Sequence, residues 1–215
     1  VFPEATYIHL VRDYRANLAS MSKHDIFSPS RTGILMQWKK SAEQISKLAE
    51  FHPEEYLQIR YEDLVTDPLN TYEKVCDFLQ LSFSAELLDP EYRKKAIRKI
   101  HGAPFLNQWH SNLSGRITGA HMYKWESELD ARTVQQADYV AGKTGQAYKY
   151  EPRSRKFGIS LMLFTELKKL LFHLNEMNRY LYDRLPYRMK RRIRNRKFIL
   201  SHRLIKLFRK PLGKN

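Results

Sequence analysis

The chain has 215 residues, of which 42% are hydrophobic and 13% aromatic, enough for a real hydrophobic core. Its single cysteine excludes an internal disulfide, and no uncharged run is long enough to form a transmembrane helix. The net charge of +15 lies in the tail, because residues 151–215 hold 19 Lys and Arg against 4 Asp and Glu, whereas residues 1–150 hold 19 of each class.

Strand and helix patterns alternate along the first third of the chain. Asp13 is placed to cap the first helix, and Asp67 before Pro68 marks a turn. Apolar spacing distinguishes the two kinds of element, with a period of two in strands and 3.6 in helices. The predicted elements are a strand at 5–11, a helix at 13–23, a helix at 34–51, a strand at 56–61 and a helix at 69–80.

The following segment is less regular. A helix is predicted at 85–98 with Ser84 as its cap, and Pro90 inside that stretch is a potential break or kink. Residues 99–122 are predicted to form a long loop, and a further helix is predicted from Ala131 to about Tyr148. Strands that alternate with helices predict the α/β class, with a parallel sheet and flanking helices.

One segment joins the first strand to the first helix and carries the clearest functional signal. Arg12 lies at the predicted end of the strand, and Ser20 follows eight residues later on the helix. A guanidinium binds phosphate oxygens in a bidentate way, and a helix N-terminus adds partial positive charge. This pattern indicates a phosphate site. The alternative is an arginine paired with a nearby carboxylate and a serine that faces solvent.

Two stretches carry a family resemblance. The sequence VRDYRANLAS at residues 11–20 resembles the 3′-phosphate-binding motif of sulfotransferases that use 3′-phosphoadenosine 5′-phosphosulfate (PAPS). The sequence RYEDL at residues 60–64 is similar to that family's later strand, in which a tyrosine contacts the adenine of the cofactor. The two motifs occur in the family's order. The resemblance covers about residues 1–150.

The resemblance implies a P-loop NTPase-like sulfotransferase fold, with PAPS as the donor of a sulfuryl group to a hydroxyl or amine. It implies that Arg12 and Ser20 bind the 3′-phosphate and that Tyr61 packs near the adenine. The family also has a basic loop over the 3′-phosphate, to which residues 99–122 correspond loosely with Arg116 as the candidate. No His, Cys, Asp or Glu cluster has metal-ligand spacing, so no metal site is predicted.

One part of the family pattern does not occur in this sequence. The loop that holds the 5′-phosphosulfate is a Gly/Ser/Thr-containing turn between a strand and a helix, and nothing here matches it. The family's usual general base, a histidine or glutamate, also precedes the 3′-phosphate motif. We therefore expect an N-terminally incomplete sulfotransferase, with catalytic residues upstream of Val1 and little or no activity in this chain alone.

The tail at 151–215 is predicted to be a basic amphipathic helical extension, separate from the sulfotransferase part at 1–150. Residues 187–210 mix basic and apolar side chains, as segments that bind anionic membrane surfaces do. Nucleic acid would attract the same charges and is the less favoured partner. A helical extension that packs on the enzyme or on another subunit is the third interpretation.

Several questions stay open at the level of sequence. The acceptor is a small molecule, a lipid, a carbohydrate or a peptide. Two other functions compete, a nucleotide-binding kinase of related fold and a membrane-surface or nucleic-acid-binding protein that acts through its tail. A cytoplasmic or peripheral membrane location is favoured, and the oligomeric state is not readable from the sequence.

Overall fold

The computed structural model describes residues 5–23, 30–101 and 117–195. Contacts divide the chain into two compact units, which are described separately. The sheet unit comprises residues 1–12 and 44–124, and the helical unit comprises residues 13–43 and 125–215. The division into domains predicted from the sequence, with a boundary at residue 150, stays a prediction.

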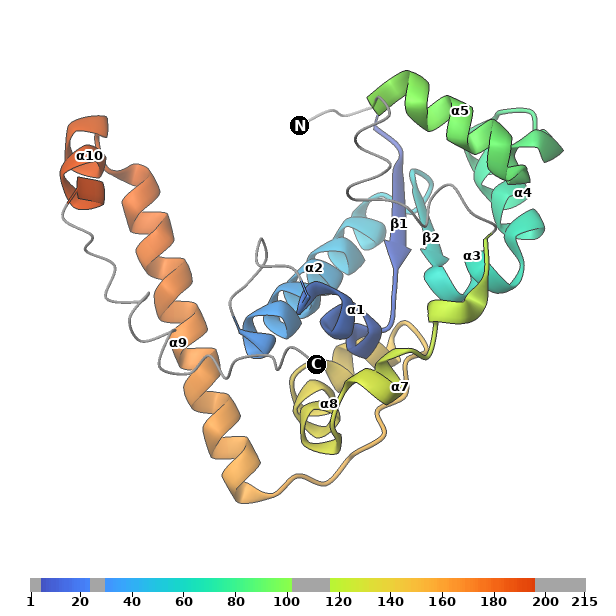
Figure 1. Ribbon diagram of the computed structural model, residues 1–215. Helices are drawn as coiled ribbons and strands as arrows, with labels where there is room; N and C mark the ends of the chain where they lie inside the picture. The colour runs from blue at the N-terminus through green and yellow to red at the C-terminus, as the bar shows by residue number, and fades with distance from the viewer. Residues whose placement is uncertain (1–4, 24–29, 102–116, 196–215) are drawn as a thin grey trace. The chain divides into compact units, whose positions relative to one another are not determined.

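The sheet unit contains two parallel strands, β1 (Tyr7–Val11) and β2 (Tyr56–Arg60), drawn as arrows in Figure 1. Their register pairs Val11 with Arg60, so the carboxyl ends of both strands lie at the same edge. In β2, Leu57 and Ile59 are buried while the residue between them is exposed, which is the alternation that the sequence predicts. The parallel pairing is confirmed.

Two helices follow β2, and the sequence predicted only the second. The predicted strand 56–61 is one residue too long, because Tyr61 begins the short helix α3 (Tyr61–Thr66). Asp67 then ends α3 and caps α4 (Pro68–Phe78), its carboxylate accepting from the backbone N–H of Asn70 at 3.3 Å. Proline suits the first position of a helix, because the N–H it lacks would have no partner there.

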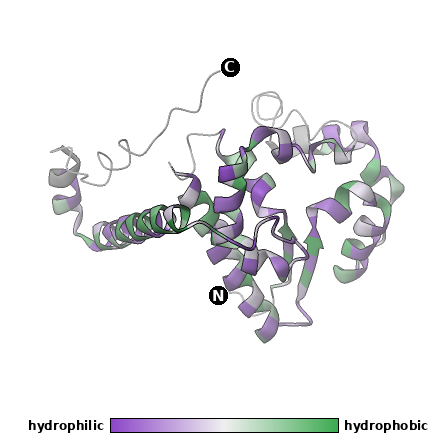
Figure 2. Cartoon of the chain, turned by 90° about the horizontal axis from the view of Figure 1, so that it is seen from below, coloured by the Kyte–Doolittle hydropathy of each residue, from purple (hydrophilic) through white to green (hydrophobic). Residues whose placement is uncertain are grey.

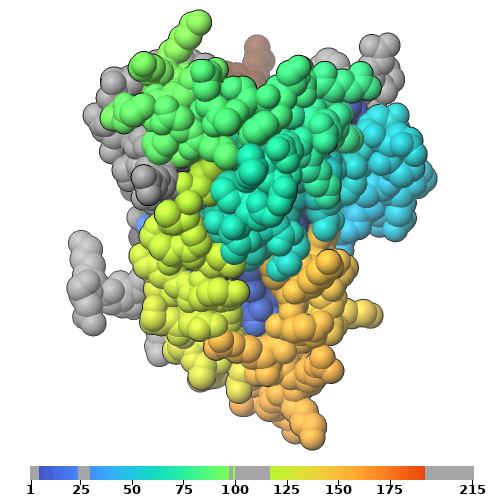
Figure 3. All heavy atoms as spheres, turned by 90° about the vertical axis from the view of Figure 1, so that its right-hand side faces the viewer, coloured from blue at the N-terminus to red at the C-terminus, as the bar shows by residue number. Residues whose placement is uncertain are grey.

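The predicted helix at 85–98 is two elements. A 3-10 turn, η1 (Ala85–Leu88), is capped by Ser84, and α5 begins at Pro90 and runs to His101. The proline therefore breaks the helix and starts the next one. The predicted loop 99–122 is also shorter than expected, because its first residues extend α5 and Gly119–His121 form the 3-10 turn η3. In Figure 3 the surfaces of α4 and α5 adjoin each other.

The helical unit is built around α1 (Tyr14–Met21), which contacts both α7 (Trp125–Glu128) and α8 (Ala131–Gln146). Small residues of α1 form a core cluster with Trp125 and Val134. The other helices are α2 (Arg31–Phe51), which continues into the sheet unit, α9 (Ile159–Arg184) and α10 (Tyr187–Asn195).

The predicted helices at 13–23, 34–51 and 131–148 correspond to α1, α2 and α8, with small shifts at their ends. Within the described part of the chain, no helix combines the length and apolar character that crossing a membrane requires.

The close approach of α8 to Tyr14 explains why position 145 is a glycine. The Tyr14 ring is fully buried and meets Trp38 edge-on, with 5.6 Å between the ring centroids. A Cβ placed on Gly145 would lie 2.6 Å from a carbon of the Tyr14 ring, which is closer than any real contact. Glycine at position 145 therefore permits α8 to pack directly on this ring.

We predict that Gly145→Ala lowers the free energy of unfolding by about 1–3 kcal/mol, because a fully packed ring must move to admit the methyl group. Urea unfolding of the full chain, followed by circular dichroism, measures the loss. Gly158→Ser is the control, because Gly158 has open space around it and serine is at least as good a helix cap as glycine. Equal midpoints for the two variants would contradict the prediction.

His9 gives the sheet unit a pH dependence. Its Nδ1 lies 2.8 Å from the hydroxyl of Tyr56 on the neighbouring strand, and burial lowers the pKa of His9 below its usual 6.5. The unfolded chain therefore binds a proton at this position before the folded chain does. Stability is lost as the pH falls from about 6.5 towards the lowered pKa, because protonation favours the unfolded state.

We predict that His9→Phe, which keeps a ring but cannot titrate, makes stability fall less steeply between pH 7 and pH 5. Denaturant titrations of both proteins across this range give the slope of unfolding free energy against pH. The same slope in both proteins would show that His9 does not contribute.

Candidate functional site

The candidate site lies at the edge of the sheet where β1 and β2 end. Arg12 follows the last residue of β1, and Tyr61 follows the last residue of β2. Because Val11 and Arg60 are partners in a parallel pair, the next residue of each strand emerges at the same edge. In open α/β sheets, ligands bind outside the carboxyl ends of the strands.

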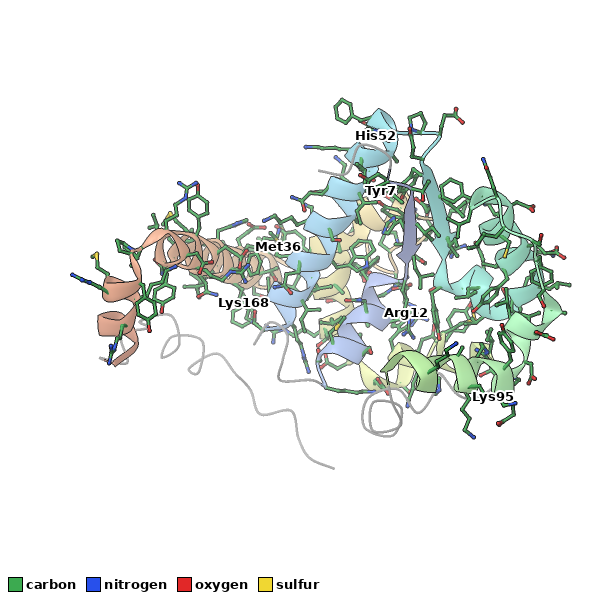
Figure 4. All side chains as sticks on the ribbon, turned by 90° about the horizontal axis from the view of Figure 1, so that it is seen from above. Tyr7, Arg12, Met36, His52, Lys95 and Lys168 are labelled. Carbon is green, nitrogen blue, oxygen red and sulfur yellow. The ribbon has the colours of Figure 1, made fainter. Side chains whose placement is uncertain are left out.

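The two side chains contact each other there. The guanidinium carbon of Arg12 lies 4.3 Å from the centroid of the Tyr61 ring, a cation–π stack. Arg12 Nη2 also donates a hydrogen bond of 2.8 Å to the backbone carbonyl of His121 in η3. Figure 4 shows Arg12 at one end of β1, with Tyr7 and His52 at the other. The structure thus brings together Arg12 and Tyr61, which were predicted from separate motifs.

Arg60, next to Tyr61, has a different electrostatic environment. Its guanidinium nitrogens lie 3.9 Å from a carboxylate oxygen of Glu62 and 3.5 Å from one of Asp63. Both acids belong to α3, which begins one residue after Arg60. Arg60 therefore neutralises the acidic side chains at the start of α3, and its charge has a structural role.

Ser20 lies on α1, as predicted, and is exposed. It belongs to the helical unit, whereas Arg12 and Tyr61 belong to the sheet unit. The expectation that Ser20 and Arg12 share one phosphate stays a prediction. The fourth candidate, Arg116, lies outside the described residues.

The start of α1 is held by a buried ion pair that sequence reasoning missed. Asp13 caps the helix by accepting from the backbone N–H of Arg15 at 2.7 Å. Its two carboxylate oxygens also accept from Nε and Nη2 of Arg15, at 3.0 and 2.7 Å. At the helix N-terminus, which the sequence suggested as a source of positive charge for a ligand, the Asp13 carboxylate thus already accepts from one backbone N–H.

This pair continues into a larger buried network. The Arg15 guanidinium lies 4.4 Å from the ring centroid of Trp125, and its Nη1 lies 3.8 Å from Asp138 Oδ1. Burial opposes the charge on Arg15, but its hydrogen bonds to Asp13 outweigh that effect and raise the pKa of Arg15. Within the motif, Arg15 therefore has a structural role.

Tyr14 completes the network. Its hydroxyl donates to Asp138 Oδ1 at 2.6 Å, and the other oxygen of Asp138 accepts from the backbone N–H of Ser154 at 2.8 Å. Burial, reinforced by the bond to Asp138, raises the pKa of Tyr14 far above its ordinary value. The phenol is therefore a permanent donor. A signal for this network was present in the sequence, since Asp13, Tyr14 and Arg15 are consecutive.

Comparison with protein families gives a match over the first part of the chain. Residues 1–85 match the model of the sulfotransferase family, and no curated protein matches the chain. The matched stretch contains Arg12, Ser20 and Tyr61 and ends before the tail. The resemblance seen in the sequence is confirmed over these residues. The match indicates a transferase and, in general terms, the transfer of sulfuryl groups.

We predict that Tyr14→Phe lowers the free energy of unfolding by about 1–3 kcal/mol, because the buried carboxylate of Asp138 loses a donor. Tyr139→Phe is the matched control, since it removes a phenol bond of similar length to Glu166 at an exposed position. The control should change stability by about 0.5 kcal/mol or less. Urea unfolding compares the two, and equal losses would show that burial does not strengthen the Tyr14 bond.

Proposed function

Starting from the sulfotransferase-family segment at residues 1–85, we propose that the chain serves sulfuryl transfer from PAPS to a hydroxyl or amine acceptor. In this proposal the sheet unit supplies the part of the donor site that binds the 3′-phosphate and the adenine. The observation that carries the proposal is the Arg12–Tyr61 stack at the carboxyl edge of the sheet.

The chemistry of the two side chains fits an adenosine 3′-phosphate. Such a ligand presents an anionic group and a flat aromatic base a short distance apart. Arg12 offers a planar fork of N–H donors, which matches phosphate oxygens, and Tyr61 offers an aromatic ring beside that fork. The stack orients the plane of the guanidinium, and its bond to the carbonyl of His121 restrains it further.

The expected contributions differ in size. Hydrogen bonds to charged groups contribute about 1.5–3 kcal/mol, so the 3′-phosphate gains most from Arg12. Ser20 is proposed to add a hydroxyl donor to the same phosphate, worth about 1 kcal/mol. Arg116 is proposed as a further cation for that phosphate.

When bound, PAPS supplies the activated sulfuryl group. The residues of this chain act on the other end of the donor, where they bind the nucleotide and hold it in one orientation. Fixing the nucleotide lowers the barrier by positioning, because a reacting group that is already oriented needs less ordering in the transition state. Arg12 and Tyr61 are thus proposed as binding residues.

The test measures binding of 3′-phosphoadenosine 5′-phosphate and of 5′-AMP to the full chain by isothermal titration calorimetry. We predict tighter binding of the 3′-phosphorylated ligand. Arg12→Ala should weaken that ligand by about 10- to 100-fold and leave 5′-AMP nearly unchanged, because only the first ligand carries the phosphate. Ser20→Ala should cost about fivefold on the same ligand.

Two controls separate these effects from misfolding. Tyr61→Phe keeps the ring and should bind nearly as the parent does, whereas Tyr61→Ala should weaken both nucleotides. Lys95→Ala removes an exposed cation from α5 in the same unit and should leave both affinities unchanged. Equal weakening of both ligands by Arg12→Ala would contradict the assigned role. A preference for ATP would favour a kinase-like enzyme.

A further inference from the structure

Helix α9 exposes a continuous apolar stripe. Its members recur at alternating spacings of four and three residues, so they share one side of the helix. Each is between 42% and 68% exposed. Figure 2 shows hydrophobic residues recurring along α9. The stripe consists of Leu163, Leu167, Leu170, Leu174, Met177 and Leu181.

The opposite side of α9 is already in use. Leu161 and Thr165 are buried, and Gln136 of α8 donates to Thr165 at 3.4 Å. Beside the stripe, Glu166 accepts from the Tyr139 hydroxyl at 2.7 Å and from Lys169 at 2.8 Å. These contacts fix the rotation of α9 against α8, so the stripe faces away from α8 as a consequence of packing.

The positions beside the stripe distinguish a flat apolar surface from a partner helix. In a coiled coil, the residues that flank the apolar seam are charged and form ion pairs between the helices. In α9 the flanks are mainly apolar or aromatic, and Glu166 is the one acidic flank, bonded within its own unit. The apolar face is therefore wider than a coiled-coil seam. The flanking residues include Phe164, Leu171 and Tyr180.

The next helix supplies positive charge. Five of the nine residues of α10 are Lys or Arg, and none is acidic. Two contacts hold α10 to the end of α9, because Lys190 Nζ donates to the carbonyl of Asp183 at 2.7 Å and the Tyr182 hydroxyl to the carbonyl of Lys190 at 3.5 Å. The described cations of α10, which are Arg188, Lys190 and Arg191, therefore lie next to the end of α9.

We propose that α9 and α10 bind the surface of an anionic membrane. The stripe of α9 enters the boundary between headgroups and acyl chains, and the cations of α10 contact the anionic headgroups. Charge complementarity favours an anionic membrane over a second copy of the chain. The cations of α10 attract anionic headgroups, whereas a second copy in parallel alignment would bring two cationic α10 helices together. The proposal is independent of the chemistry assigned to the sheet unit.

The test uses the full chain and two kinds of vesicle, phosphatidylcholine alone and phosphatidylcholine with phosphatidylserine. We expect co-sedimentation with the anionic vesicles, weakened by salt. Leu170→Asn with Leu174→Asn should reduce binding by about tenfold or more, because the apolar area that enters the membrane is lost. Arg188→Gln with Arg191→Gln should reduce it by about fivefold for each cation removed.

Matched controls carry the same chemical changes elsewhere. Arg155→Gln with Lys156→Gln removes two exposed cations outside α10, and Phe51→Asn with Leu81→Asn removes two exposed apolar side chains outside α9. Both controls should bind nearly as the parent chain does. All substituted residues are exposed, so the variants should fold, and circular dichroism verifies this.

Four results would overturn the proposal. The first is equal binding to vesicles with and without phosphatidylserine, and the second is unchanged binding in the leucine variant. The third is self-association in sedimentation equilibrium that the leucine variant abolishes, in a chain that does not bind vesicles, which would assign the stripe to helix pairing. Binding to duplex DNA in place of vesicles would likewise reassign the cations of α10.

Discussion

The parallel pairing of β1 with β2 is the constraint on which the candidate site depends. Parallel strands need a long connection between them, and residues 12–55 provide it with α1 and α2. Since Val11 is the partner of Arg60, both strands end at the same level of the sheet. The residues that follow them, Arg12 and Tyr61, are therefore brought into contact by the strand pairing itself. A shift in register of one residue would separate the cation from the ring.

Neighbouring residues of the short motif after β1 have different roles. Asp13 and Arg15 neutralise each other inside the helical unit and fix where α1 begins, while Arg12 directly follows the strand and contacts the ring of Tyr61. A sequence pattern that reads as one phosphate site thus contains the structural charges of Asp13 and Arg15 as well as the charge that we propose binds the phosphate. The alternative of a carboxylate-paired arginine concerned Arg12 in the sequence, and the buried pair that the structure shows is made by its neighbour Arg15.

Apolar periodicity predicted the two strands and most of the long helices, because those signals are repeated over many residues. It missed α3, because that helix has only six residues and its first residue, Tyr61, continues the alternation of β2. It also left open how Pro90 acts, which depends on Ser84 and Asp89 capping two separate elements. For the site, resemblance singled out Arg12 and Tyr61, but their contact needed the register of the sheet. Ser20 stays a prediction, and Arg116 lies outside the described residues.

The hydrogen bond from Arg12 to the carbonyl of His121 has a consequence for how this protein tolerates change. Any residue at position 121 supplies a main-chain carbonyl. Substitution of the His121 side chain therefore leaves the acceptor of this hydrogen bond in place. Alanine substitution at position 121 would therefore not remove the hydrogen bond to Arg12. The site therefore has a member that side-chain mutagenesis does not detect, and only a change that bends the backbone of η3 would reveal it.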